Sequence, residues 1–235
     1  MSFFKNKKNF ILEIQSKSRN EITETLENVF PVYNFSEWKI FTSEDSIKLN
    51  VLKNKESFLF ELKSKSKKPF GMIVSSPKEI EIASKYADFL YIPGEICRQS
   101  DILENAANTK LPLFVERGSF LAPNDISRII DKLGVADVAI VDCGSANGYS
   151  DSVLDPRVLH TLQNSGKPFG VNLSDLLSPE GAKYTHRPHW LMNHDFISAF
   201  INTGNAFGAL FFVIKCYGYG NISINNIIHK IPRNN

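Results

Sequence analysis

Three charged residues in this sequence end short apolar runs, where a folded protein could use them for chemistry. Glu116 ends Leu-Pro-Leu-Phe-Val-Glu, Asp142 ends Val-Ala-Ile-Val-Asp, and Lys215 ends Leu-Phe-Phe-Val-Ile-Lys. A lysine in apolar surroundings can lose its proton and form a Schiff base with a carbonyl substrate. Glu116, Asp142 or Asp175 would then transfer the proton, as in an aldolase-like site. The alternative is that Lys215 pairs with one of these carboxylates and stabilises the fold.

The elements that would position these residues are visible as an alternation of apolar runs and amphipathic segments. The predicted strands cover Phe10–Ile14, Ile47–Leu52, Gly71–Ser75, Phe89–Pro93, Leu111–Glu116, Val138–Asp142, Pro168–Leu173 and Leu210–Lys215. The predicted helices cover Ile22–Val29, Phe58–Leu62, Glu79–Tyr86, Ile102–Ala107, Ile126–Leu133, Val158–Leu162, Phe196–Ile201 and Ile222–Ile228. Near-continuous apolar strands need cover on both faces. The pattern therefore predicts an α/β fold, a (β/α)8 TIM barrel in a single domain over residues 1–235, with an open doubly wound sheet as the alternative.

Composition excludes several classes of function. The chain has 235 residues, of which 43% are hydrophobic and 22% charged, and its net charge is only +2. This balance suits one globular domain and gives no basic face for nucleic acid. We find no apolar run long enough to cross a membrane and no signal-peptide pattern, and the three cysteines are far apart. We therefore expect a cytoplasmic protein that binds neither nucleic acid nor membrane.

Three segments in the middle of the chain carry a resemblance to a known family. They read Ala-Asp-Phe-Leu-Tyr-Ile-Pro-Gly-Glu-Ile-Cys-Arg-Gln-Ser-Asp-Ile-Leu from Ala87, Val-Glu-Arg-Gly-Ser-Phe-Leu-Ala-Pro from Val115, and Val-Asp-Cys-Gly-Ser-Ala-Asn-Gly-Tyr from Val141. This series resembles the barrel of the Kdo-8-phosphate synthases, within the class I DAHP synthase family. Those enzymes join phosphoenolpyruvate to arabinose 5-phosphate in the synthesis of lipopolysaccharide sugar. The resemblance implies a TIM barrel and a transferase reaction on phosphorylated small molecules.

The resemblance also implies a set of substrate-binding positions. The family's segment after the fourth strand contains Ala-Arg-Gln-Thr-Asp, and the corresponding residues here include Arg98 and Gln99. With the positions that follow the fifth, sixth and seventh strands, the implied substrate-binding candidates are Arg98, Gln99, Arg117, Ser119, Asp175 and Arg187.

The charged positions of the family differ in this chain. Glu116 stands where the family has a lysine for phosphoenolpyruvate, and Cys143 stands where it has an anion-binding arginine. Asp175, Lys215 and Ser16 replace the histidine, glutamate and cysteine that bind metal in the metal-dependent branch. A lysine among these ligands disfavours a divalent cation. We expect no metal and no cofactor. The family's Lys-Ala-Asn-Arg run for arabinose 5-phosphate finds no match between Leu52 and Phe58, which suggests a shortened connection after the second strand.

A cluster of histidines remains outside this comparison. His186, His189 and His194 lie near Arg187 in a segment that could hold zinc, although no cysteine or carboxylate partner accompanies them. A packed loop leading into a helix is the alternative, and the role of the three histidines stays open.

Three functions therefore remain. The first is a synthase-like barrel that has lost or altered its catalysis and acts as a binding or accessory protein. The second is an active synthase with rearranged anion contacts. The third is a Schiff-base enzyme that uses Lys215. From the family we expect a homo-oligomer or association with an active relative, and a phosphorylated small molecule is the expected ligand class.

Overall fold

The structure is a computed structural model that describes residues 3, 7–15, 26–34, 56–57, 59–147, 151–177, 194–215 and 227–231. Eight parallel strands form a closed barrel in the order β1-β10-β9-β6-β5-β4-β3-β2. They are β1 (Phe10–Gln15), β2 (Val29–Asn34), β3 (Gly71–Ile73), β4 (Phe89–Ile92), β5 (Leu113–Arg117), β6 (Val138–Asp142), β9 (Phe169–Asn172) and β10 (Phe211–Lys215). The predicted (β/α)8 TIM barrel is confirmed.

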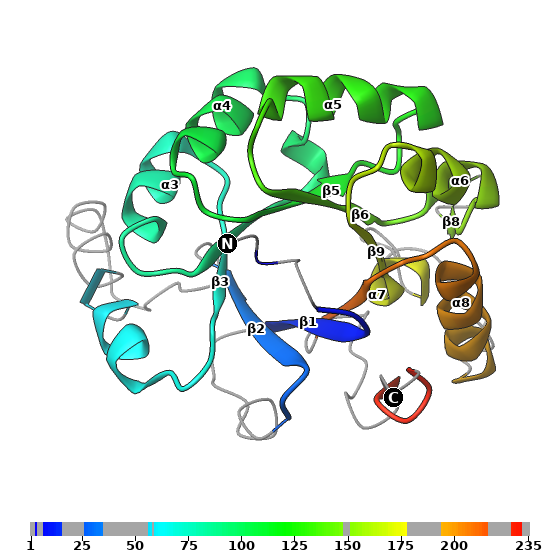
Figure 1. The fold of residues 1–235 in the computed structure, drawn as a ribbon, viewed down its shortest axis with the longest axis horizontal. Helices are drawn as coiled ribbons and strands as arrows, with labels where there is room; N and C mark the ends of the chain where they lie inside the picture. The colour runs from blue at the N-terminus through cyan, green and yellow to red at the C-terminus, as the bar shows by residue number, and fades with distance from the viewer. Residues whose placement is uncertain are drawn as a thin grey trace, which may run out of the picture.

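Helices surround this barrel (Figure 1). They are α3 (Pro77–Ala83), α4 (Ser100–Asn108), α5 (Ile126–Leu133), α6 (Pro156–Asn164), α7 (Leu173–Leu177) and α8 (His194–Ala206), and residues 59–65 are also helical. Two 3-10 turns, η1 (Gly94–Ile96) and η2 (Pro123–Asp125), precede α4 and α5. A short antiparallel hairpin of β7 (Ser145–Asn147) and β8 (Asp151–Val153) follows β6, and no sequence pattern predicted it. Among the described helices, none is both long and apolar enough to cross a membrane.

The predicted second strand is wrong. We expected Ile47–Leu52, which lies outside the described residues, but the strand between β1 and β3 is Val29–Asn34. This strand overlaps the end of the helix predicted over Ile22–Val29. Pro31 explains the error, because proline lacks an N–H and normally argues against a strand in the middle of a sheet. The connection from β2 to β3 runs over residues 35–70. The expectation of a shortened connection, which rested on the segment between Leu52 and Phe58, therefore loses its basis.

Alternate residues of each strand face opposite sides of the barrel wall. The lumen holds one apolar cluster, to which β1 contributes Phe10, Leu12 and Ile14. The space between the strands and the helices holds a second, larger cluster that includes Ile11 and Ile214. This alternation decides which polar residues at the strand ends point into the barrel.

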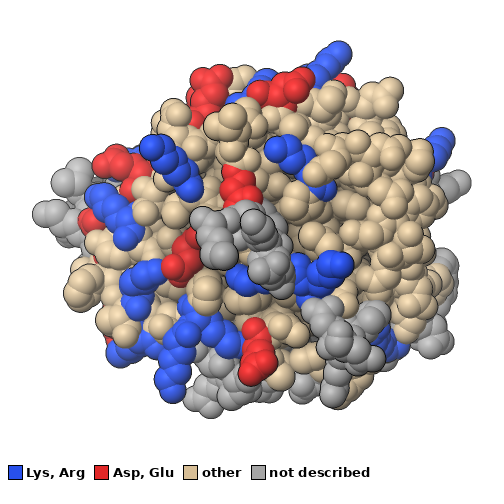
Figure 2. Space-filling model, in the orientation of Figure 1, with Lys and Arg blue, Asp and Glu red and all other residues tan. Residues whose placement is uncertain are grey.

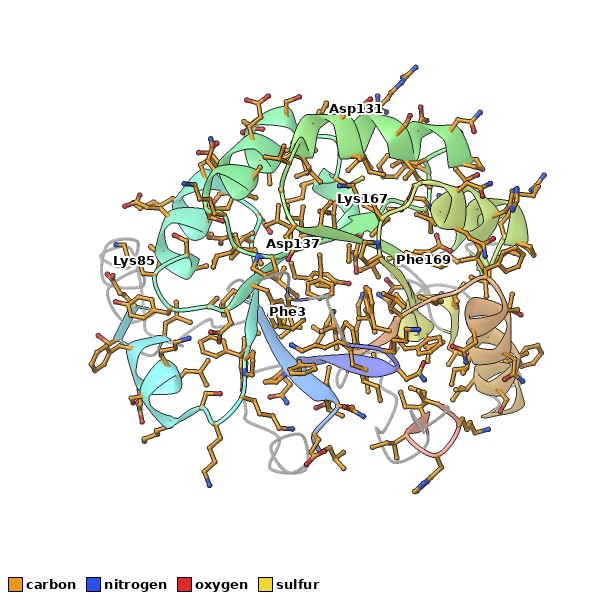
Figure 3. The ribbon with its side chains drawn as sticks, in the orientation of Figure 1. Phe3, Lys85, Asp131, Asp137, Lys167 and Phe169 are labelled. Atoms are coloured by element: carbon orange, nitrogen blue, oxygen red, sulfur yellow. The ribbon has the colours of Figure 1, made fainter. Side chains whose placement is uncertain are left out.

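The amino ends of the strands are closed by an aromatic cluster. Phe3 contacts the rings of Phe10, Phe30, Phe89 and Phe114 with centroids 5.1–6.2 Å apart. Figure 3 labels Phe3 near the middle of the ring of strands, close to Asp137, whose carboxylate accepts a hydrogen bond from the Phe3 amide at 2.9 Å. The lumen is therefore packed at this end, and a site inside the barrel would lie at the carboxyl ends of the strands.

Candidate functional site

The carboxyl ends of the strands carry a group of polar side chains that face the lumen. Glu116 follows the lumen residue Phe114 by two positions, and Lys215 likewise follows Val213. Tyr91 and Cys143 belong to the lumen cluster itself. Asn172 at the end of β9 joins this group through its hydrogen bond to Glu116. Asp175, from the first turn of α7, completes it.

Glu116 lies at the centre of this group. Its Oε1 accepts hydrogen bonds from the Tyr91 hydroxyl at 2.5 Å and the Asn172 amide at 3.2 Å, and its Oε2 accepts one from the Gly94 backbone N–H at 2.9 Å. The side chain is buried. Burial, followed by the negative charge of Asp175, raises the pKa of Glu116 to about 7, although the charge of Lys215 and the hydrogen bonds from Tyr91 and Gly94 oppose this shift. Glu116 is therefore a carboxyl group that can change its protonation state near neutral pH.

Asp175 and Lys215 form an ion pair next to Glu116. The Lys215 Nζ donates to Asp175 Oδ1 at 2.7 Å, and both side chains are less than a fifth exposed. The Asn172 amide donates to Asp175 Oδ2 at 2.7 Å and also to Glu116, so it links the two carboxylates. The sequence left open whether Lys215 forms a Schiff base or pairs with a carboxylate. In the structure it pairs with a carboxylate, which is Asp175.

Cys143 lies against the same carboxylates. Glu116, Cys143 and Asp175 each bring one potential ligand atom into a group in which all three lie within 4.8 Å of one another. Burial and the neighbouring carboxylates raise the pKa of the Cys143 thiol well above its ordinary value. The Lys215 ammonium already occupies Asp175, and it would compete with a divalent cation for that ligand. The donor set therefore fits the metal of the metal-dependent synthases poorly.

Arg117 and Asp142 face away from the lumen, because each is one position out of step with the lumen residues of its strand. Their buried side chains form an ion pair with a distance of 2.8 Å between Arg117 Nε and Asp142 Oδ1. The Arg117 guanidinium also donates to the backbone oxygens of Gly118, Leu121 and Gly144. It thus joins the loop after β5 to the loop after β6. Asp142 is bonded to Arg117 and not to Lys215.

A cavity of about 170 Å³ opens beside Glu116. Its lining contains three carboxylates, an exposed aromatic ring and the two loops that Arg117 joins. The lining residues are Gly94, Glu95, Glu116, Arg117, Gly118, Ser119, Phe120, Cys143, Ser152 and Asp175.

The remaining candidates are distributed around this cavity or lie beyond the described residues. Ser119 lines the cavity. Arg98 and Gln99 lie on the exposed turn before α4, where the Arg98 carbonyl accepts a hydrogen bond from Lys132. Arg187, His186 and His189 lie outside the described residues, as does the side chain of His194. Strand alternation could have separated Glu116 from Arg117 in advance, whereas no sequence signal pointed to the Gly94 N–H.

Three known proteins similar to this chain carry the same name. The chain is 32% identical over 161 residues to the 2-dehydro-3-deoxyphosphooctonate aldolase of Protochlamydia amoebophila, a match that covers 62% of this chain and 56% of that protein. It is 34% identical over 98 residues to the enzyme of the same name from Geobacter sp. strain M21, covering 40% and 36% of the two chains. For the enzyme from Bartonella bacilliformis the identity is 32% over 124 residues, with 50% and 44% covered.

These matches confirm the resemblance seen in the sequence, because 2-dehydro-3-deoxyphosphooctonate aldolase is another name for Kdo-8-phosphate synthase. The chain spans about half the length, or less, of the curated relatives it matches. No protein-family model matches it.

Proposed function

Starting from the chain's standing as a divergent relative of the Kdo-8-phosphate synthases, we propose that it is a synthase-like barrel whose synthase catalysis is lost or altered and which acts as a binding or accessory protein. The observation that carries this proposal is the buried carboxyl group of Glu116, at the position where the family resemblance implies a lysine for phosphoenolpyruvate.

Electrostatics at the mouth of the barrel support the proposal. Phosphoenolpyruvate carries a phosphate and a carboxylate, and such ligands are held by converging Arg and Lys side chains or backbone amides. Among the described lining residues, the carboxylates of Glu95, Glu116 and Asp175 face the cavity, while the Arg117 guanidinium is bonded to Asp142 and to loop carbonyls. Lys215 is paired with Asp175. Among the described residues that line the cavity, negative charge therefore predominates, and we expect an anion to bind weakly there.

The test is isothermal calorimetry with phosphoenolpyruvate and with arabinose 5-phosphate, each with and without a divalent metal, followed by a phosphate-release assay on mixing. We expect no heat of binding for either compound and no release of phosphate. Binding of both followed by phosphate release would overturn the proposal in favour of an active synthase with rebuilt anion contacts. The 2-dehydro-3-deoxyphosphooctonate aldolase of Protochlamydia amoebophila, assayed in parallel, serves as the positive control.

A Schiff-base enzyme that uses Lys215 is the other candidate. The proximity of Glu116, a carboxyl group with a pKa near 7, favours it, whereas the ion pair with Asp175 opposes it because it stabilises the protonated lysine. Borohydride reduction in the presence of a carbonyl compound such as pyruvate tests it. A covalent adduct on Lys215 that is absent from Lys215→Met would support this candidate.

A further inference from the structure

The turn that follows β4 is attached to β5 by a hydrogen bond to Glu116. The backbone N–H of Gly94, the first residue of η1, donates to Glu116 Oε2 at 2.9 Å. Gly94 and Glu95 line the cavity, and Arg98 and Gln99 follow on the exposed turn before α4. The protonation state of the Glu116 carboxyl group can therefore act on a segment that forms part of the cavity wall.

Every hydrogen bond that the structure describes at the Glu116 carboxyl group is donated to it. Oε1 accepts from the Tyr91 hydroxyl and the Asn172 amide, and Oε2 accepts from the Gly94 N–H. The Asn172 amide is fixed in this orientation, because its Oδ1 accepts a hydrogen bond from the Asp175 N–H at 3.2 Å. An ionised carboxylate only accepts, whereas a protonated carboxyl group must also place an O–H. The arrangement of donors therefore fits the ionised form.

Uptake of a proton by Glu116 weakens one of these hydrogen bonds. Oε1 accepts two of them, and a proton there would have to displace the Asn172 donor or reverse the Tyr91 hydroxyl. Oε2 accepts one, from Gly94, so a proton on Oε2 disturbs the fewest contacts. A hydrogen bond to a carboxylate is about twice as strong as one between neutral groups. The bond that holds Gly94 is therefore the one that depends most on ionisation.

From this geometry we propose that Glu116 is a pH-dependent switch in the cavity wall, whose ionised form holds the turn over residues 93–97 on β5 and whose protonated form releases the Gly94 N–H. The inference goes beyond the proposed function and does not depend on whether synthase catalysis is lost. Burial and the charge of Asp175 raise the pKa of Glu116 to about 7, so both forms are populated near neutral pH.

Several other titratable or charged groups lie around Glu116. They are Tyr91 on β4, Glu95 and Cys97 in the turn after it, Cys143 after β6, Asp175 on α7, and Lys215 on β10. Burial raises the pKa of Tyr91, Cys97 and Cys143, which therefore stay neutral near pH 7. Lys215 is bonded to Asp175, and Arg117 on the same strand as Glu116 is bonded to Asp142. The pH dependence of the turn is thus expected to come from Glu116.

The test follows the Gly94 amide of the 15N-labelled protein by NMR from about pH 5.5 to about pH 8.5. We expect its proton resonance to move downfield as the pH rises, with a midpoint near 7, because the hydrogen bond to Glu116 strengthens on ionisation. Hydrogen exchange at Gly94, corrected for the intrinsic rate, should slow by about fivefold over this range. Exchange through global unfolding should speed up instead, because ionisation of Glu116 lowers the stability of the fold.

Three variants assign the effect. Glu116→Gln keeps an acceptor oxygen but cannot ionise, so the titration of the Gly94 amide should disappear. Asp175→Asn removes the negative charge that raises the pKa of Glu116, and it should move the midpoint to lower pH. Glu104→Gln, on the exposed face of α4, is the matched control and should behave as the wild type. Circular dichroism verifies that all three are folded.

The outcomes that overturn the inference are distinct. A Gly94 amide that does not titrate in the wild type, or that titrates unchanged in Glu116→Gln, shows that the turn does not respond to this carboxyl group. A midpoint that stays the same in Asp175→Asn overturns the assignment to Glu116. The binding of phosphoenolpyruvate and arabinose 5-phosphate is measured separately, so failure of this inference leaves the proposed function standing.

Discussion

At the scale of single residues, Glu116 is the central polar group at the carboxyl ends of the strands. Its carboxyl group is buried, it accepts three hydrogen bonds from uncharged donors, and its neighbours are Asp175 and Cys143. Hydrogen bonding and the charge of Lys215 offset part of the cost of burial, but the pKa of Glu116 stays raised. Ionisation of this group must therefore be linked to stability.

We predict that the wild type loses stability as pH rises from about 5 to 8, relative to Glu116→Gln. The pKa of Glu116 is raised from 4.5 to about 7 in the folded state, so folding favours the protonated form. The stabilisation that comes from this raised pKa is complete at pH values below the pKa of the unfolded state. It is lost as the pH rises through the pKa of the folded state. A shift of this size corresponds to a loss on the order of 3 kcal/mol. Urea denaturation of both proteins at pH 5, 6, 7 and 8 measures it.

Glu104→Gln provides the comparison, because Glu104 is exposed and should leave the pH dependence of the wild type unchanged. A constant difference in stability between wild type and Glu116→Gln across this pH range would contradict the raised pKa.

At the scale of elements, one buried ion pair joins the loops that form the cavity. Arg117 at the end of β5 bonds Asp142 at the end of β6 and three backbone oxygens in the two following loops. Gly118 adds a second constraint, since a side-chain carbon there would lie 2.8 Å from the Gly94 oxygen and 2.4 Å from the Phe120 ring. The wall of the cavity is thus fixed by contacts outside the lumen.

We expect Arg117→Met to destabilise the protein by about 3–5 kcal/mol, because it leaves Asp142 buried without its cation. Arg117→Met combined with Asp142→Leu should recover part of that loss, since the uncompensated charge is then removed as well. Arg157→Met is the control, because the Arg157 side chain that pairs with Asp155 is exposed to solvent, so its loss should have little measurable effect.

Urea denaturation of the three variants provides the measurement. If the double variant were no more stable than Arg117→Met, the lost loop contacts rather than the buried charge would account for the effect.

At the scale of the whole molecule, the two ends of the barrel differ in character. The amino ends are sealed by Phe3 and the phenylalanines around it, and the carboxyl ends carry the polar group around Glu116. On the face shown in Figure 2, Lys and Arg side chains are interspersed with Asp and Glu. The contrast between the two ends matches the general rule for TIM barrels, in which the amino ends of the strands contribute stability and the loops at the carboxyl ends carry function.

Phe3→Ala should therefore lower the free energy of unfolding by about 2 kcal/mol without altering the titration of Glu116 at the carboxyl ends of the strands. The loss comes from apolar burial and edge-to-face ring contacts at the amino ends of the strands. Urea denaturation at several pH values measures both effects, because the raised pKa of Glu116 makes stability depend on pH. A pH dependence that differs from that of the wild type would show that the two ends are coupled.

Much of the barrel could be predicted because its strands are locally encoded. The strand Val138–Asp142 and the helix Ile126–Leu133 have the bounds that the apolar patterns predicted. A buried strand appears in a sequence as a short apolar run, and an amphipathic helix appears as apolar residues three or four positions apart. Val29–Asn34 could not be predicted in the same way. Pro31 interrupts its strand signal, and only closure of the barrel between β1 and β3 requires a strand there.

The candidate site also has a part that the sequence predicted and a part that it could not predict. The sequence by itself determined which charged residues end the strands, and hence that Glu116 and Lys215 would meet at the carboxyl ends of a barrel. Only the tertiary structure decided that Lys215 pairs with Asp175, that Arg117 turns outward to Asp142, and that Glu116 stays without a cation among its hydrogen-bond partners. Partners from strands far apart in the chain are fixed by strand order and by the closed geometry of the barrel, which no local pattern of residues contains.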